Sequence, residues 1–231
     1  MEDIQHQQMG YDRAAQTFSP DGHILQVEYA EKTVRLGSAS IGMVCKDGIL
    51  IVSDRRQKDK LIVENSANKI AEIDDHIMVV AAGITSDARV LVDKARVIAQ
   101  QHRVTYDSEV STEAIVKEIA DVKQQFTQYG GARPFGVALL IGGFNASPRL
   151  YSTDVSGNYF EYKAYAIGEN DEKLKEKLRQ EHKESLTCDE GVKLAFKIFK
   201  EVQGENFDKN RFDVAIIKQD KKIKRLKAGD L

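Results

Sequence analysis

The chain has 231 residues, of which 42% are hydrophobic and 30% are charged, and its 34 basic and 36 acidic side chains leave a formal net charge of −2. This composition is typical of a globular protein, and the length suffices for one domain with a sizeable core. The charge balance provides no overall field that favours binding to nucleic acid or an acidic membrane. No apolar run approaches the roughly 20 residues that span a bilayer, so no membrane partner is expected.

The start of the chain and its cysteines indicate a reducing compartment. The stretch MEDIQHQQMG is polar and lacks the apolar core of a signal peptide. Cys45 and Cys188 have no metal-ligand spacing, and two unpaired thiols are typical of a protein that stays inside the cell. We therefore expect a cytoplasmic protein.

The first predicted element is a short helix over residues 22–34. Ser19-Pro20 and Asp21-Gly22 form a turn that leads into it. The apolar residues then recur at spacings of three and four, which is the period of an amphipathic helix: Ile24, Val27, Ala30 and Val34.

From residue 37 the pattern changes to that of strands. Ser38 to Cys45 and Ile49 to Asp54 flank Lys46-Asp47-Gly48, and Asp-Gly between two apolar runs is a strong hairpin signal. A second pair of strands, Lys69 to Ile73 and Ile77 to Ala82, follows directly. Two helices are predicted next, at about residues 85–102 and from Ser111 to before Gly130. Their core-facing residues are Ala88, Leu91, Ala95 and Ile98, and then Ile115, Ile119, Val122 and Phe126.

The second half of the chain repeats the order of strands and then helices. Thr187 and Glu190 predict a capping box at the start of the last helix. Gly130-Gly131 and Gly142-Gly143 are interpreted as breakers, and 143–148 as a loop. The remaining predicted elements are strands at Phe135 to Gly142, Leu150 to Thr153, Asn158 to Tyr162 and Lys163 to Ile167, helices at 171–182 and 188–203, and a closing hairpin of Phe212 to Lys218 with Lys222 to Leu226.

Antiparallel hairpins that alternate with helix pairs exclude a doubly wound parallel fold. They predict an α+β protein whose two antiparallel sheets pack face to face, with a helix pair on each outer side, as a four-layer αββα sandwich. We expect one domain over 1–231, which comprises a mobile polar tail at 1–10, a turn and helix at 11–36, a sandwich core at 37–218 and a C-terminal tail at 219–231.

Several ordered stretches resemble the 20S proteasome subunit family over about residues 10 to 217. The stretch YDRAAQTFSPDGHILQVEYA at 11–30 is similar to the α-type signature, which β-type subunits lack, and the simple pattern is archaeal-like. The other matching stretches are GSASIG at 37–42, KDG at 46–48, SDRR at 53–56, Lys69-Ile70, Ala82-Gly83, DAR at 87–89 and QYGGARPFG at 128–136.

The resemblance implies an N-terminal-nucleophile hydrolase-like sandwich with an α-type N-terminal extension. It also implies a seven-membered ring of α-type subunits on rings of β-type subunits, which admits unfolded protein substrates. The first ten residues would be the gate, and Tyr11, Asp12, Pro20 and Tyr29 match its latch, in which phenols and a carboxylate can form a hydrogen-bonded cluster.

The resemblance also implies a pocket that receives the C-terminal tail of an ATPase-ring activator. Gly37, Lys69, Gly83 and Ile84 match that pocket, where a lysine pairs with the terminal carboxylate and small residues let the tail's backbone approach. The alternative for Lys69 is a surface lysine at the end of a strand.

A catalytic alternative is an autoprocessed hydrolase that uses Ser38, Asp54 and Lys69. These positions match the nucleophile, aspartate and lysine of active β-type subunits, whose nucleophile needs a free α-amine. Against it, Ser38 follows 37 patterned residues, and the predicted helix lies where a substrate would enter. The simpler interpretation is that Ser38 and Ser40 are alternate polar positions on a strand, and that Asp54 ends the next strand. We therefore expect no catalytic residue.

No other chemistry is indicated. The histidines His6, His23, His76, His102 and His182 are scattered over expected tails, turns and helix ends, so neither a metal site nor a cofactor is predicted. The basic stretch from Lys218 to Lys227 could suggest a nucleic-acid-binding module. Aromatic residues do not interleave it and acidic runs offset it, so a solvated tail is expected and no nucleic-acid partner.

Overall fold

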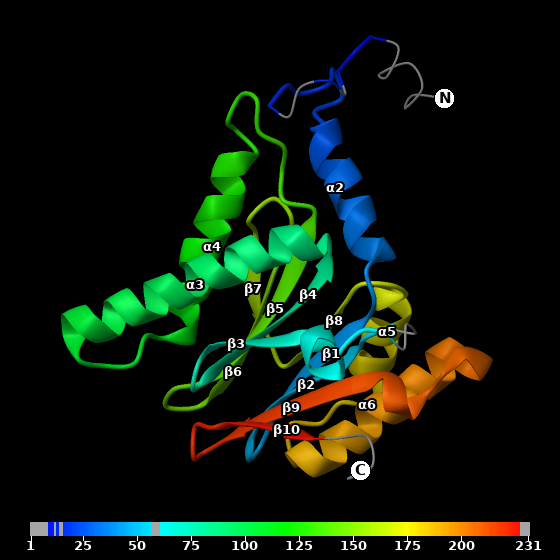
Figure 1. The fold of residues 1–231 in the computed structure, drawn as a ribbon. Coiled ribbons are helices and arrows are strands. Elements are labelled where there is room, and N and C mark those ends of the chain that lie inside the picture. The colour runs from blue at the N-terminus through cyan, green and yellow to red at the C-terminus, as the bar shows by residue number, and fades with distance from the viewer. Residues whose placement is uncertain (1–8, 12, 14–15, 57–60, 227–231) are drawn as a thin grey trace.

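The computed structural model describes residues 9–11, 13, 16–56 and 61–226, which form two five-stranded sheets and five α-helices (Figure 1). One sheet has the strand order β10-β9-β2-β1-β8 and the other has the order β3-β4-β5-β6-β7. All the strand pairings in these two sheets are antiparallel. The predicted α+β class with two antiparallel sheets is confirmed.

The first sheet pairs the first two strands of the chain with the last two and with β8. The hairpin predicted at Lys46-Asp47-Gly48 is present, and it pairs Cys45 with Gly48. The fully buried strand β2 lies in the middle of the sheet and pairs along its whole length with β9. The strands are β1 (Ser40–Cys45), β2 (Gly48–Asp54), β8 (Ala164–Ile167), β9 (Phe212–Lys218) and β10 (Ile223–Leu226).

The second sheet corrects one prediction. Gly142 and Gly143 lie inside a continuous strand and do not break it, so the expected loop at 143–148 is shorter. Both glycines are needed for close packing, because a Cβ at Gly142 would lie 2.8 Å from Ile49 Cδ1 and a Cβ at Gly143 would overlap the Thr112 hydroxyl. The strands are β3 (Ile70–Asp74), β4 (Ile77–Gly83), β5 (Val137–Phe144), β6 (Pro148–Thr153) and β7 (Tyr159–Tyr162).

The helices begin close to their predicted starts. The capping box of Thr187 and Glu190 is present. The helix after β4 has the acidic Asp87 in its first turn, but no side chain caps that helix at Ile84, and Asp87 bonds elsewhere. The helices are α2 (Leu25–Leu36), α3 (Thr85–Tyr106), α4 (Thr112–Phe126), α5 (Asp171–Glu181) and α6 (Cys188–Gln203), with 3-10 turns at Glu64–Ala67, Gly204–Asn206 and Lys209–Arg211.

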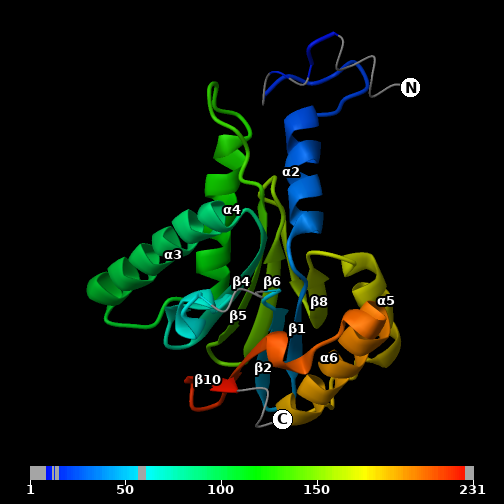
Figure 2. The ribbon, with the colours of Figure 1, turned by 45° about the vertical axis from the view of Figure 1, so that its right-hand side comes forward.

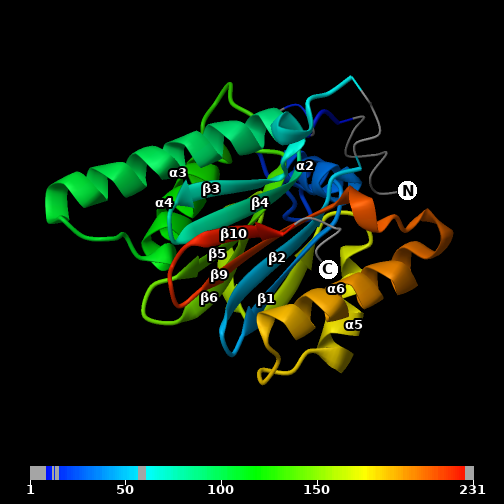
Figure 3. The ribbon, with the colours of Figure 1, turned by 60° about the horizontal axis from the view of Figure 1, so that its bottom comes forward.

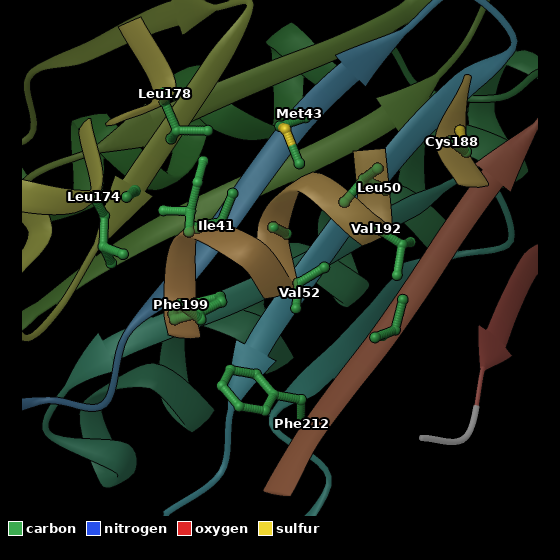
Figure 4. Close-up of a cluster of buried hydrophobic side chains, with 14 of the residues drawn as sticks. Ile41, Met43, Leu50, Val52, Leu174, Leu178, Cys188, Val192, Phe199 and Phe212 are labelled. Atoms are coloured by element: carbon green, nitrogen blue, oxygen red, sulfur yellow. The ribbon is translucent and has the colours of Figure 1, made fainter. Parts of the chain in front are cut away.

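Three buried clusters hold four layers together, with α3 and α4 on one side of the sheets and α5 and α6 on the other (Figure 3). Strand β2 shows how alternation builds them. Leu50 and Val52 pack toward α6, as Figure 4 shows, whereas Ile49 and Ile51 pack against the second sheet. The predicted αββα sandwich is therefore confirmed. No helix in the described ranges is long and apolar enough to cross a membrane.

Candidate functional site

The segment before β1 begins with a well-defined reverse turn. The amide of Gly22 donates to the Ser19 carbonyl at 2.9 Å, which makes Pro20 the second residue of the turn. Ser19 is buried, and its amide donates to the His23 carbonyl at 2.8 Å. Gly22 has φ of 83°, a backbone conformation that favours glycine. The turn predicted at Pro20 is therefore part of the folded structure.

Helix α2 follows this turn and stands at one end of the sandwich (Figure 1). It packs against β4 and β5 and buries Leu25 and Ala30. Of the predicted latch residues, Tyr29 lies half-buried on α2, with the Lys32 amine 5.1 Å from its ring centroid. Tyr11 is half-buried in the segment before the turn. Asp12 and most of the predicted gate at 1–10 lie outside the described residues.

The described residues before α2, which we call the leading segment, also meet the loop that follows α4. In both Figure 1 and Figure 2, residues near the start of the chain lie beside the tip of the loop that connects α4 to β5. A Cβ at Gly130 would lie 3.4 Å from the side chain of Gln16, so these two segments are in contact. The conformation of residues 16–24 is therefore supported by α2 below and by this connection beside it.

The structure brings the predicted tail-pocket residues together. A Cβ at Gly37 would overlap the backbone nitrogen of Gly83, so the chain before β1 touches the end of β4 directly. Ile84 follows Gly83, and Gly37, Gly83 and Ile84 are each partly exposed. This backbone contact requires a glycine at 37, whereas Gly83 has φ of 121° and a Cβ there would overlap the Gly136 carbonyl oxygen.

Lys69 reaches the same place from the start of β3. Its Nζ donates to the Ser38 carbonyl at 2.5 Å and to Ser40 Oγ at 3.1 Å. Burial lowers the pKa of Lys69 to about 7, while the nearby Asp54 opposes that change. The amine therefore lies beside Gly37-Ser38 but points inward, toward β1. The amine is therefore more buried than that of the surface lysine in the alternative interpretation would be.

The residues of the hydrolase alternative have other partners in the fold. Asp54 is buried, and both of its oxygens are held by Arg211, with Nε to Oδ1 at 2.8 Å and Nη2 to Oδ2 at 2.5 Å. Gln203 donates a further bond of 2.8 Å to Asp54 Oδ2. Ser38 precedes β1 instead of lying in it, and its nitrogen is an amide joined through Gly37 to α2. The expected strand position of Ser38 is wrong, whereas Asp54 does end β2.

The structure differs from expectation at one histidine and in the basic stretch, where Lys218 lies in β9 and Lys224 and Arg225 lie in β10 and not in a solvated tail. His76 lies in the β3–β4 turn but is fully buried, and its Nε2 is 2.8 Å from the Val110 carbonyl oxygen. His6 lies outside the described residues. No metal-binding group of three or more His, Cys, Asp or Glu side chains occurs in the described part of the chain. Charges of the basic stretch form ion pairs within the fold: Lys218 with Asp47, Lys221 with Glu109, Lys224 with Asp220, and Arg225 with Glu72.

Two ion pairs near the site were not predicted from the sequence. Arg211 clamps Asp54 from 157 positions away, and Arg133 binds Asp87 from 46 positions away. Both oxygens of Asp87 accept from the Arg133 guanidinium, at 2.6 and 2.8 Å, and this pair holds the pKa of Asp87 below its usual range. Neither pair has a local pattern that could have revealed it, because the partners belong to different elements.

Comparisons with known proteins agree with this architecture. The family model described as "Proteasome subunit" matches residues 34–217, and the model for the N-terminal signature of A-type proteasome subunits matches residues 11–32. A proteasome alpha subunit from Methanococcus maripaludis is 47% identical over 219 residues, which cover 93% of this chain and 83% of the relative. Proteasome alpha subunits from Archaeoglobus fulgidus and Pyrococcus abyssi are 47% and 44% identical, and the matches cover 81% and 97% of this chain and 76% and 86% of the relatives.

A four-layer sandwich whose β1 is preceded by a folded turn and helix thus matches the proteasome subunit family over most of its length, and the chain belongs to that family. The match over residues 11–32 and the names of the relatives place it among the α-type subunits of the 20S proteasome. The predicted resemblance is therefore confirmed.

Proposed function

We propose that this chain is a non-catalytic member of a seven-membered outer ring that controls the admission of unfolded polypeptide to a β-type partner carrying the threonine active sites. In this proposal residues 1–10 form the gate, and Tyr11, Asp12, Pro20 and Tyr29 latch it. The pocket around Gly37, Lys69, Gly83 and Ile84 takes the C-terminal tail of an ATPase-ring activator.

One observation supports this proposal above the others: the segment before β1 is an integrated part of the fold. Its turn has backbone hydrogen bonds and a buried Ser19, α2 packs on β4 and β5, and Gln16 contacts Gly130. A propeptide that is removed to release a nucleophile has no need of such contacts. The segment therefore suits a permanent role at the surface where the sandwich meets its surroundings.

The pocket can be tested with Lys69→Ala in core particles assembled with a β-type partner. The variant should lose activation of peptide hydrolysis by an ATPase ring, because the tail's carboxylate loses its cationic partner, while ring assembly is retained. Lys173→Ala, which removes an exposed lysine of α5, is the matched control and should keep activation. Unchanged activation of the Lys69 variant would exclude this pocket assignment.

The hydrolase alternative can be separated by the intact mass of the chain purified after co-expression with a β-type partner. A mass that includes residues 2–231 leaves Ser38 with an amide nitrogen and supports the gating role. Loss of residues 1–37 would expose the amine of Ser38 next to the Lys69 amine, and would make the hydrolase the better explanation.

A further inference from the structure

The connection between α4 and β5, residues 127–136, touches both the tail pocket and the leading segment, and we call it the bracing loop. Resting on the gating function proposed above, we propose that the bracing loop couples the tail pocket to the leading segment, and that Arg133 and Asp87 are the positioning residues for this coupling. The bracing loop makes contacts at three places: its base, its middle and its tip.

The base of the bracing loop is a single residue that three elements share. The Gly136 amide donates to Asp87 Oδ2 at 2.9 Å, and its carbonyl accepts from the Ile84 amide at 2.9 Å. The Thr33 hydroxyl of α2 lies 2.9 Å from the same carbonyl and 2.7 Å from the Ala30 carbonyl. A Cβ at residue 136 would lie 2.7 Å from Ile84 Cδ1 and 2.8 Å from Thr33 Oγ1, so a larger residue would displace both side chains. The tail pocket, α3 and α2 therefore meet at Gly136.

The middle of the bracing loop is fixed to α3 by the two parallel bonds between Arg133 and Asp87. Asp87 is 7% exposed, whereas the Arg133 side chain is 58% exposed. A guanidinium that engages both carboxylate oxygens fixes orientation as well as distance. Because Asp87 also binds the Gly136 amide, one buried carboxylate sets the position of the loop's middle and of its base.

The tip of the bracing loop supports the leading segment. Gly130 contacts the side chain of Gln16, four residues before the Pro20 turn. The Phe126 ring packs against Phe135 and Tyr129, with centroid distances of 4.6 and 6.3 Å. These aromatic contacts tie the two ends of the loop together, so a displacement at the base moves the tip.

We expect a tail that binds against Gly83 and Ile84 to displace the Ile84 amide. The Gly136 carbonyl, which accepts a hydrogen bond from that amide, should move with it. The first turn of α3 and the bracing loop then shift together, because Asp87 holds both. The loop's tip carries this shift to Gln16 and the Pro20 turn. Removal of the Arg133 guanidinium leaves Gly37, Lys69, Gly83 and Ile84 in place but releases the middle of the loop. The pocket should then still bind a tail without transmitting the effect.

The experiment uses core particles assembled with a β-type partner. The probe is a synthetic peptide with the C-terminal sequence of an ATPase-ring activator and a free carboxylate, and its amidated form is the blank. Binding of the probe and stimulation of fluorogenic-peptide hydrolysis are measured for wild type, Arg133→Gln and Lys69→Ala. Arg179→Gln, which changes an exposed arginine of α5, is the control and should behave as wild type.

The Arg133 variant should still bind the probe, but its stimulation should fall about 2- to 30-fold, the range typical of residues that mediate coupling. Lys69→Ala should lose binding itself. Wild-type stimulation in Arg133→Gln, together with the expected loss in Lys69→Ala, would overturn the coupling while leaving the proposed function intact. A wild-type particle that neither binds the probe nor responds to it would overturn both.

A second pair of variants keeps the test decisive if Arg133→Gln does not assemble. Thr33→Ser retains the hydroxyl that lies between Ala30 and Gly136, and Thr33→Val replaces it with a methyl group of similar size. The serine variant should keep wild-type stimulation, and the valine variant should show a reduced response with probe binding preserved. Equal stimulation in both variants would contradict the proposed coupling, because a merely structural methyl contact would be kept in valine and lost in serine.

Discussion

Replacing Lys123 by methionine should change how the stability of this protein depends on pH. Lys123 on α4 is fully buried, and its Nζ has no carboxylate partner among the hydrogen bonds that it forms. The amine donates to the carbonyl oxygens of Asp154 at 2.9 Å and Val137 at 3.0 Å, and lies 3.3 Å from that of Thr153. Methionine has a similar length, so the variant removes the amine and keeps most of the packing.

The size of the effect follows from the pKa of Lys123, which burial lowers to about 7 while Asp154 partly opposes the change. Between pH 7 and the ordinary lysine range, the native state binds fewer protons than the unfolded state. The free energy of unfolding therefore rises with pH in this window, and the dependence disappears below about pH 7, where both states are protonated. Integrated from pH 7 to pH 9, the contribution of Lys123 is about 2 kcal/mol.

Guanidinium unfolding followed by far-ultraviolet circular dichroism measures this, since the chain contains no tryptophan. Wild type and Lys123→Met are compared at pH 7 and pH 9 at equal protein concentration. The stability of wild type should increase by about 2 kcal/mol more than that of the variant. Lys69 is present in both proteins, so its own contribution cancels. Lys173→Met, at an exposed position on α5, should follow wild type. Parallel pH dependences for wild type and Lys123→Met would refute this reasoning.

Three further predictions concern the pocket and its surroundings. A bound carboxylate favours protonated Lys69, whose pKa is about 7, so the affinity for a tail peptide should fall about tenfold per pH unit above pH 7 in calorimetric titrations; a constant affinity up to pH 9 would contradict pairing with this amine. Arg211→Met should lower the free energy of unfolding by roughly 3 kcal/mol, because it strips the buried Asp54 of its charged partner, and an unchanged denaturation midpoint would show that the pair is dispensable. Gly83→Ala should lower the free energy of unfolding by roughly 2 kcal/mol or more, because Gly83 has positive φ and a Cβ there would overlap a backbone carbonyl. Gly131→Ala should lower it less, because Gly131 also has positive φ but faces open space. Equal thermal shifts in the two variants would mean that the overlap at Gly83 is relieved.

The parts of the fold that the sequence predicted well are those encoded over a few residues. The Asp47-Gly48 hairpin and the Thr187 capping box each lie within four positions of the chain. Glycines were harder to interpret, because Gly142-Gly143 in β5 and Gly130-Gly131 after α4 have the same local appearance. The first pair is required by side chains that pack onto it from other elements, and the second follows the end of a helix.

The candidate site likewise has features that the sequence located and features that only the structure shows. Resemblance located Gly37, Lys69, Gly83 and Ile84 along the chain, but only the structure shows that Gly37 touches Gly83 and that the Lys69 amine turns toward Ser38. The burial of His76 was also missed, since a histidine after two aspartates has the local pattern of a surface turn.

The sequence by itself determined the order of strands and helices, which faces of them are apolar, and the family, because each of these is a property of neighbouring residues or of an ordered set of motifs. The tertiary structure alone decided which charges from distant parts of the chain meet. Arg211 reaches Asp54, and Arg133 reaches Asp87, from distant parts of the chain. A buried carboxylate must find a partner wherever the fold places one, and that position depends on the packing of whole elements and not on the residues beside it in the chain.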